Sequence, residues 1–452
     1  MSYEDYSEPD MEYQPSWSEL FENCISPTLS QAFIFTSHLL MYNVVYTFNL
    51  HFFCTSEKRF HMLTTLTGLC FIYMCAFRFN EEAYHVLPLV YGAYILLHTF
   101  KTLNLNVGYC IGSVIVPVLI AYEFGYQNHA AWLKIKSVVM VAMMKVISLA
   151  FEMNDPKSKH QNIPSILEYS GYIWCPGNSV LGPWISYKDY VERFHKQPKL
   201  SLQWLISIFQ YTVTALLFVV LSNCVVTYFI TDSVNRYVLS FRDALIFRLS
   251  HYFISYLGSA AMVAAAFNSN EENNGKWKYT ITNPIEIEVP RSLVSVVINW
   301  NIPTHTFLKK YIFAGFLPYG NFTAVLMTYL VSSMLHGLNI EVSMVLLSLG
   351  FFSFVQFKFQ DVVASFINCC TRVRACRHCR HTNKYYMRPI FNFLFMATTV
   401  VYLAYTGCLM TTINHIANAD EVFDSVVARW QGVNLYGHYL ALASVFLTCI
   451  LT

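Results

Sequence analysis

Residues 311–357 read YIFAGFLPYGNFTAVLMTYLVSSMLHGLNIEVSMVLLSLGFFSFVQF, and this stretch decides the fold class. Glu341 is its only formally charged residue, and His336 is its only other titratable side chain apart from the tyrosines. A helix that spans a bilayer needs about 20 mostly apolar residues. The stretch therefore predicts two membrane helices, Phe322–Leu338 and Val342–Phe357, joined by a short turn.

The whole chain has the composition of a membrane protein. Its 452 residues are 55% hydrophobic and 17% aromatic but only 12% charged, about half of the roughly 25% found in soluble domains. Apolar stretches recur along the chain, separated by short polar segments. We expect an all-α, polytopic helical bundle of roughly ten to twelve membrane helices, some of them short or re-entrant.

The distribution of charge predicts two regions and an orientation. Residues 1–28 form an acidic tail, and residues 29–452 form the membrane domain. The first 30 residues lack the basic and apolar regions of a signal peptide, so insertion is expected to rely on the spans. The positive-inside rule assigns the basic segments to the cytosol and the acidic ones to the lumen. The cytosolic segments are 57–59, 157–160, 188–199, 309–310 and 372–388, and the lumenal ones are 1–28 and 414–424.

This orientation carries two further predictions. Counting from the cytosolic pair Lys309 and Lys310, the span from Phe322 rises to the far side, so His336 lies toward the lumen. Asn321 begins an Asn-Phe-Thr sequon on the cytosolic side, so we predict that it carries no glycan.

The net charge of +2, with no concentrated basic surface, argues against a nucleic-acid partner.

His336 is the main candidate for chemistry. Tyr329, Ser332, Ser333 and His336 recur at helical spacing and form a polar stripe on an apolar helix, which predicts a cavity or a partner helix beside it. An ionisable group inside a membrane is costly and usually functional, although a histidine can also simply hydrogen-bond to a neighbouring helix. Gly337 would let another backbone or a substrate approach closely. A neutral imidazole suits removal of a proton from a hydroxyl.

A second motif, Asn299-Trp300-Asn301-Ile302-Pro303, lies upstream. Asn301 could serve as a helix N-cap, since Pro303 fits a first helical turn. An amide at a helix start could also donate a hydrogen bond to a developing oxyanion. Both interpretations remain open for Asn301.

A third segment, Glu168–Tyr190, is dense in glycine, proline and aromatic residues. Gly182-Pro183-Trp184 within it is typical of a turn at the membrane interface, and an aromatic belt with helix breakers would give the same composition.

Together these pieces resemble the membrane-bound O-acyltransferase family, in which a Trp-Asn pair precedes a membrane histidine by some tens of residues. Here Asn301 precedes His336 by 35 residues. The segments PRSLVSVVINWNIP (Pro290–Pro303) and SSMLHG (Ser332–Gly337) are most similar to family members that lipidate Wnt proteins in the endoplasmic reticulum. The resemblance runs from about Glu168 to the C-terminus.

The resemblance implies a multi-pass enzyme of the endoplasmic reticulum membrane, with Wnt proteins, long-chain acyl-coenzyme A and membrane lipids as partners. It implies transfer of a palmitoleoyl group, a monounsaturated sixteen-carbon chain, from palmitoleoyl-coenzyme A to a Wnt serine, through a tunnel that converges on His336. By motif, His336 would be the catalytic base and Asn301 would position the thioester or its oxyanion. The expected substrate-binding residues are Trp300, Tyr329, Ser332, Leu335 and Arg291, with Lys309 or Lys310 as further phosphate contacts.

The loop 369–388, rich in cysteine, histidine and arginine, is predicted to be cytosolic. A structural zinc bound by Cys370, Cys376, Cys379 and His381 is sterically reasonable, and S-acylation of these juxtamembrane cysteines is the alternative. Cys175 is another candidate for S-acylation. Most other cysteines are expected to act as small apolar side chains.

Two other functions remain open. A related acyltransferase could modify a lipid or another secreted protein. A transporter would need several intramembrane acids and an internal repeat, and the sequence offers few such acids and no convincing repeat.

Overall fold

The computed structural model describes residues 15–75, 84–125, 129–156, 161–195, 200–267, 279–373, 387–410 and 419–452. Over these ranges the regular structure is helical and contains no strand, which confirms the predicted all-helical fold. The first half contains α1 (Trp17–Leu20), α2 (Ser26–Phe53), α3 (Glu57–Cys75), α4 (Val86–Thr102), α5 (Val107–Gly125), α6 (His129–Asn154), α7 (Ile166–Ile173), α8 (Pro176–Ser179) and α9 (Tyr187–His195).

The second half carries the motifs singled out in the sequence. Its helices are α10 (Leu202–Val220), α11 (Val226–Phe229), α12 (Arg236–Ala264), α13 (Pro284–Glu288), α14 (Leu293–Trp300), α15 (Ile302–Leu308), α16 (Ala314–Phe316), α17 (Asn321–Leu335), α18 (Ile340–Phe366), α19 (Met387–Gly407), α20 (Ala419–Gly432) and α21 (Tyr436–Leu451). The predicted pair of helices around His336 is therefore present as α17 and α18.

Several described helices are long and apolar enough to cross a bilayer. Four segments meet this condition by length and composition: Val107–Gly125, Leu202–Phe229, Ile340–Phe366 and Met387–Met410. The pair Asp424–Gly432 and Tyr436–Leu451, bent by 71°, adds a fifth if it forms one broken span. The multi-pass helical architecture is confirmed, and the count of ten to twelve spans stays a prediction.

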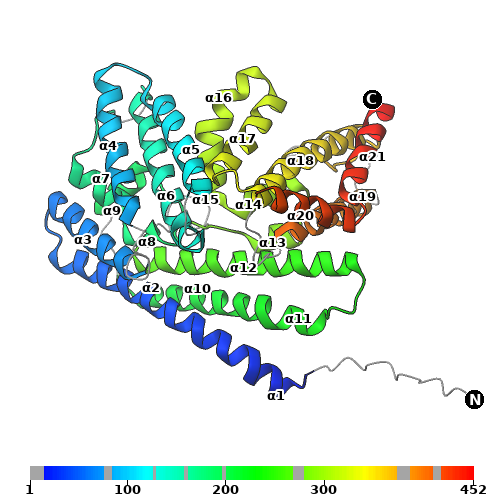
Figure 1. Ribbon diagram of the computed structural model, residues 1–452, viewed down its shortest axis with the longest axis horizontal. Helices are drawn as coiled ribbons and strands as arrows, with labels where there is room; N and C mark the ends of the chain where they lie inside the picture. Colours follow the sequence, from blue (N-terminus) through cyan, green and yellow to red (C-terminus); the bar gives the residue numbers. More distant parts are fainter. Residues whose placement is uncertain are drawn as a thin grey trace, which may run out of the picture.

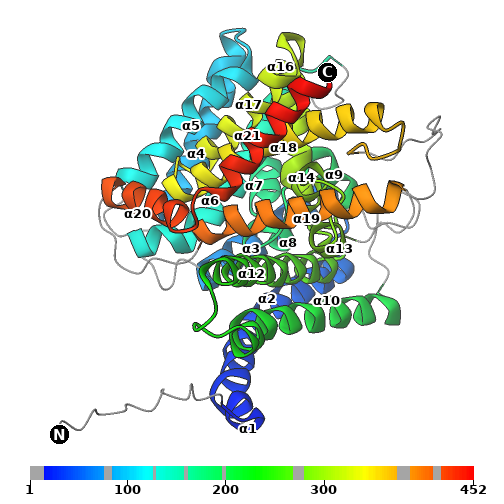
Figure 2. The same ribbon diagram turned by 90° about the vertical axis from the view of Figure 1, so that its right-hand side faces the viewer.

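The long helix α12 connects two groups of helices (Figures 1 and 2). It packs against α2, α8 and α10 and also against α19. Helices α3 to α9 gather at one end of the view in Figure 1, and α18 to α21 gather at the other. The motif-bearing helices α14, α15 and α17 lie between these two groups.

The aromatic segment around α7 to α9 is part of the buried core. Tyr169, Tyr172 and Trp174 are fully buried, and Trp184 Nε1 donates to Ser148 Oγ at 3.1 Å. Gly182 is required there, since a Cβ would lie 2.1 Å from the Cα of Asn178.

A buried lysine fixes this segment to α6. The ammonium of Lys145 donates to the carbonyls of Tyr172 and Ile173, both at 2.9 Å, and to Asn178 Oδ1 at 2.7 Å. Three acceptors satisfy all three N–H groups of the cation, which is what burial of a lysine requires.

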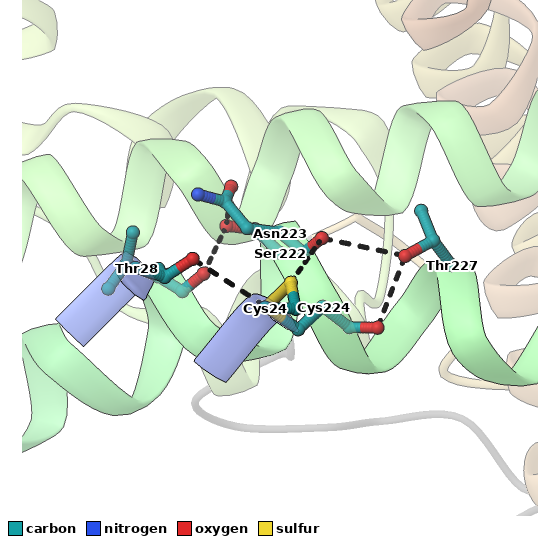
Figure 3. The surroundings of a disulfide bond; sticks show 7 residues. Cys24, Thr28, Ser222, Asn223, Cys224 and Thr227 are labelled. Carbon is teal, nitrogen blue, oxygen red and sulfur yellow. Dashed lines mark hydrogen bonds between the residues drawn. A yellow bond between two sulfur atoms is a disulfide. The ribbon is translucent and has the colours of Figure 1, made fainter. Parts of the chain in front are cut away.

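A disulfide joins Cys24 to Cys224, 200 residues apart in the sequence (Figure 3). Each cysteine lies in a single π-helical turn, Phe21–Ile25 before α2 and Leu221–Val225 between α10 and α11. These two cysteines depart from the expectation that most scattered cysteines act as small apolar side chains, because the fold brings together thiols that lie 200 positions apart in the sequence. Disulfides persist in oxidising compartments, so this end of the molecule is expected on the lumenal side, as predicted for the acidic tail.

Candidate active site

A cavity of about 1330 Å³ lies among α12, α14, α15, α17, α18 and α19. We call it the motif cavity, because the sequence motifs meet on its walls. Trp300, Asn301, Tyr329, Ser332 and His336 all line it. Five of the seven residues predicted for catalysis or substrate binding are thus brought to one space.

His336 sits at the C-terminal end of α17, where the backbone holds it in place. The N–H of Gly337 donates to the carbonyl of Met334, and that of Leu338 donates to Ser333, both at 2.9 Å. Gly337 has φ +74°, so this is a Schellman motif with glycine in the left-handed conformation. The helix end is closed by backbone hydrogen bonds, which leaves the imidazole side chain to face the cavity.

Asn301 is the N-cap of α15, which is one of the two roles predicted for it. Its Oδ1 accepts from the N–H of Thr304 at 3.1 Å, and Pro303 lies in the first turn. The capping bond uses the amide oxygen and fixes the orientation of the side chain. The amide NH₂ is the group that remains to donate, so the cap and the predicted donor role are compatible.

Trp300 is held by a stacked histidine that the sequence analysis missed. The rings of Trp300 and His251 are 4.1 Å apart between centroids and 6° from parallel. His251 Nε2 also lies 2.8 Å from the Trp300 carbonyl oxygen, to which it donates. Both residues line the motif cavity, but their 49-residue separation gave no local signal.

The polar stripe on α17 divides between the cavity and a helix contact. Tyr329 and Ser332 line the cavity, whereas Ser333 is fully buried and donates back to the Tyr329 carbonyl at 3.0 Å. Tyr329 packs closely on α18 at Gly350, where a Cβ would lie 2.8 Å from the ring. Leu335 is buried and is not a lining residue.

The cavity has a basic end remote from His336. Phe322 and Phe354 pair with ring centroids 5.1 Å apart, so α17 and α18 run antiparallel and Lys358 lies beside the start of α17. Lys309, Lys358 and Arg372 line the cavity, and Arg372 is paired at 2.9 Å with Asp361, which lines it too. The 15 residues of α17 correspond to about 22 Å of helix, which separates the Lys358 end from His336.

The other predicted basic contacts lie elsewhere. Arg291 does not line the cavity, and its guanidinium donates to the carbonyls of Arg372 at 2.8 Å and Cys370 at 3.0 Å. Lys310 pairs with Glu152 at 3.0 Å. Arg291 thus holds the segment that carries the lining residue Arg372, and of the three predicted basic contacts only Lys309 lines the cavity.

A buried carboxylate beside the turn that carries His336 was also not predicted from the sequence. The buried carboxylate of Glu123 is 2.7 Å from Lys136 Nζ and accepts from Trp132 Nε1 at 2.6 Å and Asn339 Nδ2 at 3.3 Å. A Cβ on Gly337 would lie 2.8 Å from Glu123 Cβ. The group closest to Gly337 is therefore a side chain of α5, where another backbone or a substrate was predicted.

The predicted zinc ligands Cys376, Cys379 and His381 lie outside the described residues. Cys370 is described and is 4% exposed, and its carbonyl rather than its thiol makes the contact with Arg291. Cys175 is fully buried. A buried thiol is poorly placed for S-acylation, so that prediction for Cys175 gains no support from its position.

Comparison with known proteins relates the chain to one family. The model of the membrane-bound O-acyltransferase family matches residues 22–406. The protein-serine O-palmitoleoyltransferase porcupine of Anopheles gambiae is 30% identical over 94% of this chain and 92% of its own length. The protein of the same name from Homo sapiens is 29% identical over 74% of this chain and 77% of its own. Lysophospholipid acyltransferase 2 of Arabidopsis thaliana is 23% identical over 63% of this chain and 70% of its own.

Proposed function

Because this chain belongs to the membrane-bound O-acyltransferase family, we propose that it transfers a palmitoleoyl group from acyl-coenzyme A to a serine of Wnt proteins in the endoplasmic reticulum membrane. The names of the relatives from Anopheles gambiae and Homo sapiens support the reaction and the acyl group. The single structural observation that carries the proposal is that His336 and Asn301 line the same cavity.

The proposed reaction uses each of these two side chains once. His336 takes the proton from the serine hydroxyl as the oxygen attacks the thioester carbonyl. The carbonyl oxygen becomes an oxyanion, and the amide of Asn301 donates a hydrogen bond to it. When the intermediate collapses, the carbon–sulfur bond breaks, the serine ester remains, and the coenzyme A thiolate takes the proton from His336.

The shape and charge of the motif cavity agree with an acyl-coenzyme A donor. Lys309 and Lys358 provide positive charge for the phosphates. Apolar side chains, among them Val345, Leu349 and Leu403, provide walls for a fatty chain. In the predicted orientation the basic end faces the cytosol, where coenzyme A is made available, and His336 lies toward the lumen, where a secreted acceptor would enter.

The proposal is tested by the choice of acceptor. Membranes that contain the wild-type chain are supplied with labelled palmitoleoyl-coenzyme A and a Wnt peptide with its acceptor serine, or the same peptide with that serine replaced by alanine. We expect label on the serine peptide alone. Equal labelling of both peptides, or of neither while another acceptor is labelled, would overturn the Wnt assignment.

A second candidate is acyl transfer to a lysophospholipid, which the similarity to lysophospholipid acyltransferase 2 of Arabidopsis thaliana favours. The same membranes are assayed with a lysophospholipid in place of the peptide. Label in the lipid fraction without label on the peptide would establish this candidate and leave the family assignment intact.

A further inference from the structure

A second cluster of polar side chains lies outside the motif cavity, where α3 meets α7. Glu57 and His61 are one turn apart on α3, and Glu168 is in the first turn of α7. One ligand atom from each of the three lies within 4.8 Å of the other two. We call these three residues the Glu-His-Glu cluster. None of them lines the motif cavity.

The imidazole of His61 is buried, and only one of its two ring nitrogens has a hydrogen-bond partner among the described residues. Its exposed fraction is 2%, and its Nδ1 is 2.8 Å from the hydroxyl of Tyr190 on α9. Its Nε2 is buried and has no hydrogen-bond partner among the described residues. The nearest carboxylate oxygen of Glu57 is 3.8 Å from Nε2, which is too far for a hydrogen bond.

Both carboxylates are placed so that they can bind an ion together with His61. Glu168 accepts from the N–H of Ser165 at 2.6 Å in a capping box, which fixes its side chain at the start of α7. The side chain of Glu57 is 52% exposed, so the cluster is reachable from solvent. The two carboxylates place like charges at close range, where they repel each other, and a cation between them removes this repulsion.

The spacing of His61 and Glu57 fits a shared metal ion better than a direct hydrogen bond. Two bonds of about 2.1 Å to a shared zinc ion span at most about 4.2 Å between ligand atoms, and the separation of His61 Nε2 and Glu57 Oε1 is 3.8 Å. One imidazole nitrogen with two carboxylates also balances the charge of a divalent cation. A hydrogen bond from the other ring nitrogen, as to Tyr190, is the usual way in which a ligating histidine is oriented.

We propose that Glu57, His61 and Glu168 bind a divalent metal ion of the zinc class, with water completing the coordination, and that this ion joins α3 to α7. Zinc is the appropriate probe, because borderline-soft ions take mixed nitrogen and oxygen ligands, whereas Mg²⁺ and Ca²⁺ prefer oxygen alone. Tyr190 acts as a positioning residue through its contact with His61.

The test compares the metal content of matched variants. Full-length protein purified in detergent is stripped with a chelator, incubated with Zn²⁺, desalted and analysed by elemental mass spectrometry. The wild type should hold one zinc per chain more than Glu57→Gln, and Zn²⁺ should raise the Tm of the wild type more than that of the variant. Glu22→Gln, which changes an exposed glutamate far from the cluster, is the matched control and should behave as the wild type.

A further variant tests the positioning role. Tyr190→Phe should keep the site but weaken zinc affinity by about 10–100-fold. Any ion bound by the cysteine-rich loop is common to all these proteins and cancels in the difference. Equal zinc content in the folded wild type and Glu57→Gln would overturn the proposal and leave the proposed acyl transfer untouched, since the cluster and the motif cavity share no residue.

Discussion

Two histidines of this chain occupy opposite kinds of environment. His336 ends a helix and faces a cavity of about 1330 Å³, and the described contacts that hold its turn are made by the backbone and by Glu123. His61 is packed between helices, bound to Tyr190 through one nitrogen and surrounded by carboxylates at the other.

The difference shows that the surroundings of a histidine decide whether it can exchange protons with a substrate or bind a metal ion. A side chain that is to exchange protons with a substrate needs open space and a fixed backbone, as His336 has. A side chain that is to hold an ion needs neighbours that fix its ring and supply negative charge, as His61 has.

The largest effect is expected from His336→Ala. Loss of a general base should lower the rate of acyl transfer by about 10²–10⁴-fold, while the thermal stability of the protein should change little, because backbone bonds close α17. Transfer to the serine peptide is measured at matched expression, with exposed His38→Ala as control. A rate near that of the wild type would remove His336 from the chemistry.

The next effect is expected at Asn301, where two substitutions separate its roles. Asn301→Ala removes both the cap and the donor, so kcat should fall by about 10²–10³-fold and stability by about 1 kcal/mol. Asn301→Asp keeps an oxygen for the Thr304 N–H but loses the amide donor. It should keep the stability and lose the rate, and a stable, fully active Asp variant would refute the donor role.

A smaller effect, on stability, is expected at Gly337. In Gly337→Ala the new Cβ would meet Glu123 at 2.8 Å in a left-handed backbone, which should cost about 1–2 kcal/mol and disturb the turn that holds His336. The control is Gly112→Ala in α5, where a Cβ meets nothing within 4 Å. Thermal unfolding in detergent should show a lower Tm for the first variant only.

No effect is expected at the sequon of Asn321. Asn321→Gln should leave the electrophoretic mobility of the protein unchanged, and treatment with a glycosidase should not alter the wild type, since this end of α17 is predicted to face the cytosol. A mobility shift from the removal of a glycan would reverse the orientation and place the basic end of the cavity in the lumen.

The sequence predicted those parts of the site that depend on local pattern. Tyr329, Ser332 and His336 follow from helical spacing on an apolar helix, and the cap at Asn301 follows from the Pro303 that comes after it. Helical spacing alone did not separate Ser333 from the residues of the stripe that line the cavity. Its hydroxyl bonds back to its own helix instead.

The remaining parts depend on contacts between distant segments. Glu123 reaches Asn339 across 216 positions, and the disulfide joins cysteines 200 positions apart. The Glu-His-Glu cluster needs α7 to dock on α3 before its third member arrives. Only packing of helices brings such residues together, so a pattern within one helix carries no trace of them.

Photo-crosslinking shows whether the motif cavity holds the acyl donor beside His336, as the proposed reaction requires. Wild-type membranes are irradiated with palmitoleoyl-coenzyme A that carries a photoreactive group on the chain, and the labelled peptides are identified by mass spectrometry. We expect label on residues that line the cavity, such as those of α12, α17 and α18, with competition by unlabelled donor. If the label that unlabelled donor removes is confined to α3, α7 and α9, the donor binds outside the motif cavity and the proposed reaction at His336 is wrong.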